Sequence, residues 1–292
     1  MEKTPLVYIV LVNYFTCDDT VECVESIQKE ISYKNYHIVV VDNSVSDEEY
    51  YNLLKLLPKE VTVIKSDTNE GFAAGCNIGI KLAQQNDAQY VLLLNNDTLI
   101  KSKNLIESFL SCFCMHNVGM VGGKIYYNYD REKVWYSGGK ISNIRLKALN
   151  QNLSNEIVET EFITGCLQFI DMDAIKKIGL MDESYFMYYE DADYCERMRK
   201  AGYTLLYNGN AQIYHKVSAS NPQSSATSVY YSNRAHYIYL KRYYDKVMYN
   251  IDFWIELYIK RVLYRGERRK KIVKLIREIK NDEIEWKNVQ YK

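Results

Sequence analysis

The chain has 292 residues, enough for one large or two small domains, and its 47% apolar and 25% charged residues exclude a disordered or fibrous protein. The 37 basic and 37 acidic residues cancel, and no apolar run reaches the ~18 residues that a membrane-spanning helix needs. The seven cysteines lack C-x-x-C pairing and residues 1–5 lack the features of a signal peptide, so we expect a soluble cytoplasmic protein with reduced thiols.

The balanced charge is unevenly distributed along the chain. Residues 260–280 contain ten Lys or Arg against two Glu, a net charge of +8, so the rest of the chain sums to −8. Because nucleic-acid-binding proteins neutralise phosphates with basic surfaces, the acidic body indicates that nucleic acid is not a partner.

The first part of the chain alternates between strand and helix patterns. Continuous, β-branched apolar runs predict strands that are buried on both faces of a parallel sheet. Amphipathic stretches between them predict helices, with Asp18 and Asp47 as the expected caps. This order indicates an α/β fold that binds ligands at the carboxyl ends of its strands. The predicted strands are residues 6–12, 37–41, 61–64 and 90–94, and the predicted helices are residues 18–31, 47–57 and 71–85.

The second part of the chain is less regular. A helix is predicted for residues 190–201, closed by Gly202, and the Tyr-rich chain from residue 228 onward is expected to be helical. Residues 140–159 are polar and receive no assignment. Strands are predicted at residues 118–127, 204–207 and 212–214, a strand and turn at residues 134–139, and a buried strand or strand-turn at residues 162–172.

Polar side chains follow two of the predicted strands, at the point where each strand ends. Asp42 and Asn43 follow the second strand, and Asn95, Asn96 and Asp97 follow the fourth. Either group alone is explained equally well as a turn, because Asp and Asn favour turns. Together, at neighbouring strand ends of an open α/β sheet, they favour a ligand site.

A third candidate is the glycine-rich stretch at residues 69–80. Gly71, Gly75 and Gly79 would let the backbone approach a ligand or a neighbouring strand closely. The stretch contains neither the G-x-G-x-x-G fingerprint of dinucleotide-binding folds nor the G-K-[ST] of a P-loop. Its spacing alone therefore does not identify a ligand.

An acidic cluster follows an aromatic stretch. Glu190, Asp191 and Asp193 come directly after residues 185–189, which are mostly aromatic. Like charges beside an apolar surface raise carboxylate pKa values, as a general base requires. The alternative is an acidic first turn that complements the helix dipole, which explains the charges but not the aromatic residues.

Five motifs, in this order along the chain, resemble those of the inverting glycosyltransferases of family 2, in their bacterial rhamnosyltransferase-like branch. The resemblance covers residues 6–234 and does not extend clearly into the C-terminal tail. The motifs are Val12-Asn13-Tyr14, Val40-Val41-Asp42-Asn43-Ser44, Asn69-x-Gly71-Phe72-Ala73-x-Gly75-x-Asn77-x-Gly79, Leu92-Leu93-Leu94-Asn95-Asn96-Asp97-Thr98 and Met181-Asp182-Glu183-x-x-Phe186-Met187-Tyr188-x-Glu190-Asp191-x-Asp193.

The resemblance implies a GT-A fold, in which a Rossmann-like nucleotide-binding half with a mixed, mostly parallel sheet is fused to an acceptor-binding half. The catalytic domain is then expected at residues 1–227, with the donor half at about 1–125 and the acceptor half at about 126–227. Residues 228–292 would form a helical, basic extension.

The resemblance also implies roles for the residues at the strand ends. Asp42 resembles the carboxylate that accepts a hydrogen bond from the donor's base, and Asn95-Asn96-Asp97 stands where the family carries its D-x-D motif. Asp97 is the one carboxylate left in that motif to bind Mg²⁺ or Mn²⁺. The residues expected beside them in the donor site are Asn13, Asn69, Gly71 and Asn77.

The Glu190-Asp191 pair resembles the E-D motif of the family, whose second member is the catalytic base. Asp191 would take the proton from the acceptor hydroxyl, and Asp193 and Tyr188 are expected to bind the acceptor. A lone histidine such as His215 is more often structural than a metal ligand. His215 lies 24 residues after Asp191, however, where related enzymes supply a histidine to the metal, and we therefore predict that it is a ligand.

The resemblance thus predicts a metal-dependent transferase that moves a sugar from a nucleotide-diphosphate donor to a hydroxyl of a growing cell-surface glycan. In related enzymes this acceptor glycan is often linked to a lipid. It favours dTDP-L-rhamnose as donor and leaves UDP-activated galactose, N-acetylglucosamine and galactofuranose open. Two other classes are a sugar-nucleotide nucleotidyltransferase and an inactive nucleotide-sugar-binding module. Residues 13–16 lack the glycine-rich basic loop of the former, and the acidic cluster and Asp97 speak against the latter.

The C-terminal tail leaves two interpretations open. Ile251, Trp254, Tyr258 and Val262 fall near helical spacing and are followed by the basic segment, so residues 251–280 resemble a helix that lies on an anionic membrane surface. A helix that packs on the catalytic body or on a second subunit fits the same pattern. The first interpretation would place the protein peripherally on the inner face of the cell membrane.

Overall fold

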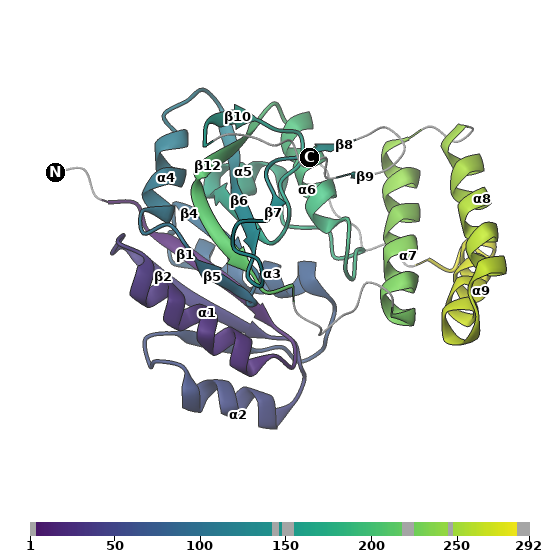
Figure 1. Ribbon diagram of the computed structural model, residues 1–292, viewed down its shortest axis with the longest axis horizontal. Helices are drawn as coiled ribbons and strands as arrows, with labels where there is room; N and C mark the ends of the chain where they lie inside the picture. The colour runs from purple at the N-terminus through teal and green to yellow at the C-terminus, as the bar shows by residue number, and fades with distance from the viewer. Residues whose placement is uncertain (1–3, 142–145, 148–154, 218–224, 245–247, 285–292) are drawn as a thin grey trace.

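The computed structural model describes residues 4–141, 146–147, 155–217, 225–244 and 248–284. A central sheet with helices on both faces forms the body, and three C-terminal helices stand beside it (Figure 1). Neighbouring strands of the central sheet follow one another in the order β10-β12-β6-β11-β4-β1-β2-β3. Two further strands lie outside this order: β5 pairs with β12, and β7 pairs with β6. This architecture confirms the predicted α/β class with a C-terminal helical extension.

Three of the four strands predicted in the first part of the sheet are buried on both faces, whereas β3, at the edge of the sheet, is only half-buried. Along β1 (Val7–Asn13), Ile9 and Leu11 enter the core on one face, while Tyr8 and Val10 enter the core on the other. This alternation explains why the strand is apolar without interruption. The parallel neighbours of β1 are β2 (Tyr36–Asp42) and β4 (Tyr90–Leu94), and β3 (Thr62–Lys65) pairs in parallel with β2.

Three helices connect these strands, at positions close to those predicted. They are α1 (Cys17–Glu30), α2 (Asp47–Leu56) and α3 (Phe72–Gln85). The predicted caps were wrong by one or two residues. Ser46 caps α2, because its hydroxyl accepts a hydrogen bond from the Glu49 N–H, and Asp47 lies in the first turn. Thr16 is the residue before α1, so Asp18 also lies inside the first turn.

The second part of the sheet mixes strand directions. The strand β11 (Leu167–Asp171) runs antiparallel between β4 and β6 (Val118–Tyr127). The strand β12 (Thr204–His215) runs parallel to β6, so the sheet is mixed but mostly parallel in the strand order given above. The sequence predicts two separate strands here. They are one strand, because a register shift between Asn208 and Gln212 lets it pass the irregular stretch without leaving the sheet.

Shorter elements complete the body of the molecule. The strand predicted at residues 134–139 is limited to three residues, and the helix predicted at residues 190–201 ends one residue early, before Gly202. Part of the polar stretch at residues 140–159 lies outside the described residues. The elements are β5 (Thr98–Ile100), β7 (Val134–Tyr136), β8 (Lys140–Ile141), β9 (Leu146–Lys147), β10 (Ile157–Glu159), α4 (Leu105–Cys112), α5 (Met172–Ile178) and α6 (Glu190–Lys200).

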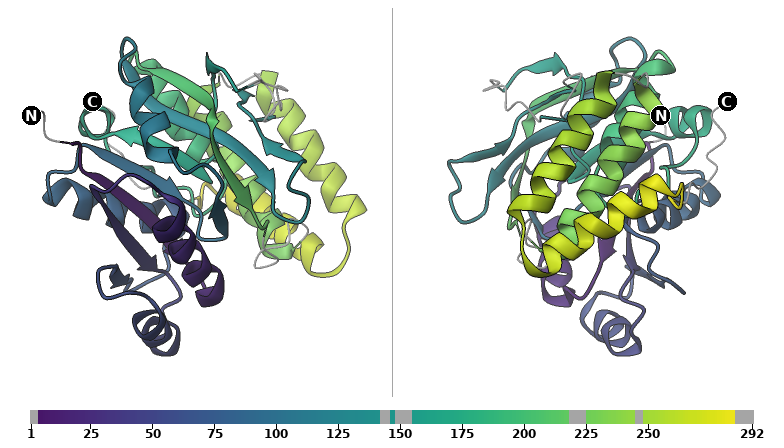
Figure 2. Two further views of the ribbon diagram at one scale, coloured as in Figure 1. Left: turned by 60° about the vertical axis from the view of Figure 1, so that its left-hand side comes forward. Right: turned by 90° about the vertical axis from the view of Figure 1, so that its right-hand side faces the viewer.

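The C-terminal segment forms three helices that lie side by side at one end of the molecule (Figure 2). They are α7 (Ala226–Tyr243), α8 (Met248–Leu263) and α9 (Gly266–Lys280). Their apolar side chains share a core with Tyr185 and Ala192 of the body, so the extension packs on it. The expected domain boundary between residues 227 and 228 falls in the first turn of α7. Within the described ranges, no helix is both long and apolar enough to cross a membrane.

Candidate active site

A cavity of about 690 Å³ opens where β1, β2 and β4 end. Parallel strands bring their carboxyl ends to one edge of the sheet, and the loops that follow therefore meet there. Of the residues expected in the donor site, those that line the cavity are Asn69, Gly71, Asn95, Asn96 and Asp97. The other lining residues are Val12, Tyr14, Thr16, Asn43, Phe72, Phe186, Met187, Ser225, Thr227 and Tyr231.

The two residues expected to bind metal lie in contact. Antiparallel pairing of β5 with β12 places Thr98 opposite His215, so the preceding residue, Asp97, reaches the imidazole. Asp97 Oδ1 lies 3.1 Å from His215 Nε2, and the edge of the Trp135 ring packs against the imidazole at 4.6 Å between ring centroids. Only a small fraction of either side chain is exposed, at 13% for Asp97 and 8% for His215.

The protonation of His215 depends on its neighbours. Burial alone would lower the pKa of this imidazole, but Cys166 and Asp97 raise it to about 10. When it is protonated, the histidine forms an ion pair with Asp97. A cation bound by the same two side chains would have to displace this proton, so metal binding should strengthen as pH rises.

The Asp97 and His215 pair fits a divalent cation that is held mainly by its substrate. Within the described part of the chain, no cluster of three or more metal-ligating side chains exists. Mg²⁺ takes one or two protein carboxylates and completes its shell with water and phosphate oxygens, and Mn²⁺ accepts carboxylate and imidazole ligands. Asp97 lines the cavity, where a diphosphate would supply the remaining oxygens.

The two carboxylates of the E-D motif begin α6 and lie behind Phe72. Asp191 Oδ2 accepts a hydrogen bond of 2.9 Å from the Gly165 N–H, and its Oδ1 accepts one of 2.8 Å from its neighbour Ala192. Burial raises the pKa of Asp191 and these backbone hydrogen bonds lower it, with a net rise. The ring of Phe72, which lines the cavity, and the Asp191 side chain both border Gly165.

Glu190 is buried more completely than Asp191. Its side chain is 7% exposed, and Oε2 has no hydrogen-bond partner among the described residues. Burial, followed by the charge of Asp191, raises the pKa of Glu190 to about 8. Burial and the neighbouring negative charge therefore favour the protonated form of Glu190.

The turn directly before Glu190 and Asp191 has a strained backbone. Tyr188 and Tyr189, directly before α6, have left-handed backbone φ values of 70° and 67°. Bulky residues rarely adopt this conformation, and such strain is concentrated at functional sites. Tyr188 packs beside the core that the C-terminal helices share with the body.

The glycine-rich stretch is joined to the loop before α6 by a close backbone contact. The Phe72 N–H donates a 2.8 Å hydrogen bond to the Phe186 carbonyl oxygen. Gly71 has a φ of 98°, and a Cβ atom there would lie 2.0 Å from the same oxygen. Glycine is therefore required at position 71 both by its backbone conformation and by the space available.

Asn13 and Asp42 lie behind the cavity and are fully buried. Asn13 Nδ2 donates to Asp42 Oδ1 and to Glu49 Oε1, each at 3.0 Å, and so fixes the orientation of the Asp42 carboxylate. Asp42 Oδ2 has no hydrogen-bond partner in the described structure. A buried carboxylate oxygen of this kind lacks the partner that buried polar groups normally have.

Two expected site residues hold the protein together instead of lining the cavity. Asn77 bonds to both backbone groups of Met181, with Nδ2 donating to the carbonyl at 2.9 Å and Oδ1 accepting from the N–H at 3.0 Å. Asp193 is fully buried and accepts hydrogen bonds from Arg197 at 2.9 Å, Arg242 at 3.0 Å and Tyr243 at 2.7 Å. These contacts tie α3 and α7 to the segment around α6.

One wall of the cavity was not predicted from the sequence. Phe186 and Met187 line it from the loop before α6, and Tyr231 of α7 stacks on Phe186 at 4.3 Å between ring centroids. The unexplained aromatic stretch at residues 185–189 was the signal for this wall. Nothing in the sequence indicated that the first turns of α7 would reach it.

The body of the molecule, which carries this cavity, matches a known family. A family model described as "Glycosyl transferase family 2" covers residues 8–179, more than half of the chain. The chain belongs to glycosyl transferase family 2. It is a glycosyltransferase, and the predicted resemblance to the rhamnosyltransferase-like members is confirmed.

Curated relatives and solved structures agree with this family. The dTDP-rhamnosyl transferase RfbF of Shigella flexneri is 23% identical over 248 residues, covering 81% of this chain and 80% of that protein. An N-acetylglucosaminyl-diphospho-decaprenol L-rhamnosyltransferase of Mycobacterium tuberculosis is 30% identical over 79 residues, 27% of this chain and 26% of that protein. The crystal structure of GalNAc-T7 with UDP, GalNAc and Mn²⁺ superposes with a TM-score of 0.67 at 16% identity, covering 97% of this chain and 58% of that one. The GT-A fold expected from the sequence is therefore confirmed.

Proposed function

We propose that this glycosyltransferase is inverting and metal-dependent, and that it transfers rhamnose from dTDP-L-rhamnose to a hydroxyl of a growing cell-surface glycan. The observation that carries the proposal is the contact between Asp97, on the cavity wall, and His215. The similarity to RfbF supports the choice of donor. The presence of Mn²⁺ with UDP in the GalNAc-T7 structure supports a divalent cation, which we propose is Mg²⁺ or Mn²⁺.

The donor would lie in the cavity with its base toward Asp42 and its diphosphate toward residues 95–97. Asp42 Oδ2, buried and without a partner among the described residues, is suited to accept a hydrogen bond from the base. Asn69 and Gly71 would border the donor from the glycine-rich stretch. When bound, the cation would neutralise charge on the leaving diphosphate, and Asp97 and His215 would hold it.

Asp191 would act as the base. Its two backbone hydrogen bonds fix the carboxylate, and Glu190 keeps its own proton and so adds no second negative charge beside it. Asp191 accepts the proton of the acceptor hydroxyl as the oxygen attacks the anomeric carbon from the face opposite the diphosphate. A single displacement of this kind inverts the configuration and needs no covalent intermediate. The acceptor would approach along Phe186 and Tyr231, the aromatic side of the cavity.

The acceptor is proposed to be lipid-linked. The name of the mycobacterial relative includes a diphospho-decaprenol acceptor, which supports this choice. A lipid-linked acceptor would require the protein to work in the cytoplasm at the inner face of the cell membrane, with residues 251–280 as the peripheral contact.

Slow hydrolysis of the donor tests the proposal. Purified protein is incubated with dTDP-L-rhamnose and with UDP-activated galactose, N-acetylglucosamine and galactofuranose, with Mn²⁺, with Mg²⁺ or with EDTA. We expect cleavage of dTDP-L-rhamnose only with metal, and a loss of at least about a hundredfold in Asp97→Ala. Asp18→Ala, an exposed carboxylate on α1, is the matched control and should cleave at the rate of the wild type.

Other outcomes of the same assay are decisive. Cleavage that is equal with EDTA, or unchanged in Asp97→Ala, would contradict the metal assignment. Cleavage of a UDP-sugar instead would replace the proposed donor. If no donor is cleaved, the binding of each nucleotide with and without Mn²⁺ separates a strict need for acceptor, which predicts metal-dependent binding, from an inactive site.

A further inference from the structure

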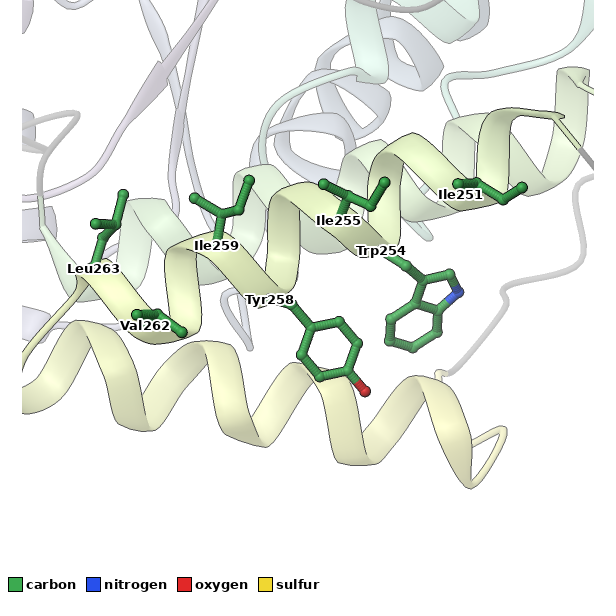
Figure 3. A pocket seen from close by; sticks show the side chains of 7 residues that line it. All are labelled: Ile251, Trp254, Ile255, Tyr258, Ile259, Val262 and Leu263. Atoms are coloured by element: carbon green, nitrogen blue, oxygen red, sulfur yellow. The ribbon is translucent and has the colours of Figure 1, made fainter.

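The helix α8 carries apolar side chains on two opposite sides. Phe253 and Leu257 are buried in the core that α8 shares with α7 and α9. On the other side, Ile251, Ile255 and Ile259 follow one another at intervals of four residues and are 58%, 52% and 50% exposed. Figure 3 shows these three isoleucines and Leu263 in a row along α8, on the side away from α9.

The exposed row, with the adjacent Val262, forms the α8 apolar face: Ile251, Ile255, Ile259, Val262 and Leu263. Val262 and Leu263 are the most exposed of the five, at 78% and 71%. A contiguous apolar surface of this kind marks an interaction site, because single exposed apolar residues are ordinary but a row along one helix is not.

Basic residues surround the end of this face. The segment at residues 260–280 has a net charge of +8, and its members near the tip of the α8–α9 hairpin are exposed. Arg261 and Arg265 flank the last turn of α8, and Arg268 and Arg269 open α9. An apolar helix face bordered by cations is complementary to an anionic lipid surface. The apolar side chains can contact the acyl chains, and the cations can bind the negatively charged head groups.

A second copy of this chain fits the same face less well. A two-fold dimer places the same patch of both subunits in contact, so pairing centred on the Leu263 end of the α8 apolar face would bring two segments of net charge +8 together. An anionic lipid surface covers the apolar side chains and neutralises the charge at the same time. The positive charge beside the α8 apolar face therefore favours an anionic lipid surface over a second copy of the chain.

We propose that the α8 apolar face inserts into the head-group region of an anionic membrane, with the basic tip of the α8–α9 hairpin bound to the lipid phosphates. This assignment deepens the membrane contact proposed above and rests on the proposed function for its biological role. It names the residues that insert and predicts that the helix lies along the membrane surface.

The α8 apolar face ends close to the cavity of the candidate active site. Leu263, at its end, also borders a hollow of about 550 Å³ together with Tyr264, Arg265 and Ser225. Ser225 in turn lines the cavity of the candidate active site. A glycan on a membrane-bound lipid would thus find the mouth of the cavity beside the surface on which α8 rests.

Sedimentation with vesicles tests the inference on the full-length protein. One set of vesicles contains phosphatidylcholine alone, and the other contains equal parts of phosphatidylcholine and phosphatidylglycerol. We expect the wild type to bind the anionic vesicles at least about tenfold more tightly, with binding that weakens as salt is added. The double substitution Ile255→Glu and Ile259→Glu should reduce this binding at least about tenfold, since it places two charges in the inserted face.

Matched variants separate this face from general effects of charge. The substitutions Leu54→Glu and Leu56→Glu introduce the same charge at two exposed leucines of α2 and should leave vesicle binding unchanged. The substitutions Arg268→Gln and Arg269→Gln should weaken binding to anionic vesicles alone. Circular dichroism and thermal unfolding check each fold, and the arginine variant keeps the inference testable if the isoleucine variant does not fold.

Three results would overturn the inference. The first is that the wild type does not bind anionic vesicles, and the second is that the α2 variant loses as much binding as the α8 variant. The third is that the wild type sediments as a dimer, which the substitutions in α8, but not those in α2, convert to a monomer. Donor hydrolysis without vesicles is measured in parallel. Vesicle binding by a protein that neither cleaves a donor nor binds its nucleotide in the presence of Mn²⁺ would support this inference while counting against the proposed function.

Discussion

The cavity has two walls of different origin and chemistry. The strand-end wall, formed by Thr16, Asn43 and residues 95–97, follows β1, β2 and β4 and carries hydroxyl, amide and carboxylate groups. The aromatic wall, formed by Phe186, Met187 and Tyr231, comes from the loop before α6 and from α7. Polar groups at the ends of parallel strands suit a nucleotide diphosphate, whereas aromatic rings suit the apolar face of a sugar. We propose on this basis that donor and acceptor are recognised by separate parts of the chain.

The largest effect is expected at Asp191, the proposed base. Asp191→Asn removes the base and keeps the shape of the side chain, so transfer should fall by roughly 10²–10⁴-fold while donor binding stays close to that of the wild type. Initial transfer rates and the dissociation constant of the donor nucleotide, measured on the same preparation, check both parts. A loss of donor binding equal to the loss of rate would place Asp191 at the donor instead.

The next effect concerns the close contact between Gly71, in the glycine-rich stretch, and Phe186 of the aromatic wall. In Gly71→Ala a Cβ atom would meet the Phe186 carbonyl, so we expect a large loss of stability and of donor binding together. Gly179→Ala is the matched control, because Gly179 has a similar φ of 85° but nothing within 4 Å of the added atom. The control should lose about 1–3 kcal/mol from backbone strain alone.

Urea unfolding measures both glycine variants. Gly71→Ala should be less stable than Gly179→Ala by about 1–3 kcal/mol, the usual range for overpacking. Equal losses would mean that the close contact between Gly71 and Phe186 contributes nothing beyond the backbone conformation.

The third effect is a dependence of stability on pH. The pKa of Glu190 is about 8 in the folded protein against 4.5 as its ordinary value. Between these values the unfolded chain has lost the proton that the folded chain keeps, so stability should fall as pH rises from about 4.5 to about 8. Glu190→Gln cannot ionise and should therefore be more stable than the wild type at pH 8, by on the order of a few kcal/mol, and by much less at pH 5.

Urea unfolding at several pH values checks this prediction. Glu48→Gln, which changes an exposed carboxyl on α2, is the control and should give a difference that does not change with pH. A pH-independent difference for Glu190→Gln as well would show that Glu190 ionises normally in the folded protein.

The contrast between the walls also explains how much the sequence could predict. The strand-end wall depends on strands that are close in the chain. The apolar runs and the polar residues after them therefore predicted the α/β class and four of the lining residues, Asn43, Asn95, Asn96 and Asp97. The aromatic wall depends on how α7 packs against the loop before α6, a contact between residues 45 positions apart in the case of Phe186 and Tyr231. A contact between residues so far apart in the chain cannot be predicted from a local sequence pattern.

Burial explains why motif positions differ in their contacts. Asn77 and Asp193 belong to the same motifs as the cavity residues, yet Asn77 bonds to Met181 and Asp193 lies among Arg197 and Arg242. A motif shows that residues occur together in a family, whereas a buried amide or carboxylate must find partners inside the protein. We therefore propose that these two residues position α3 and α6 and do not touch a substrate.

The smallest effect is expected at Tyr231, which tests whether the aromatic wall serves the acceptor. Tyr231→Ala removes the ring that stacks on Phe186, a contact worth about 0.5–1.5 kcal/mol, so the KM of the acceptor should rise by roughly threefold to tenfold. Tyr231→Phe keeps the ring and should behave like the wild type, and donor binding should change in neither variant. Steady-state kinetics with the donor saturating measure the acceptor KM. A rise in the KM of the donor instead would mean that the two walls share the donor, because the aromatic wall would then contact the transferred sugar before the acceptor arrives.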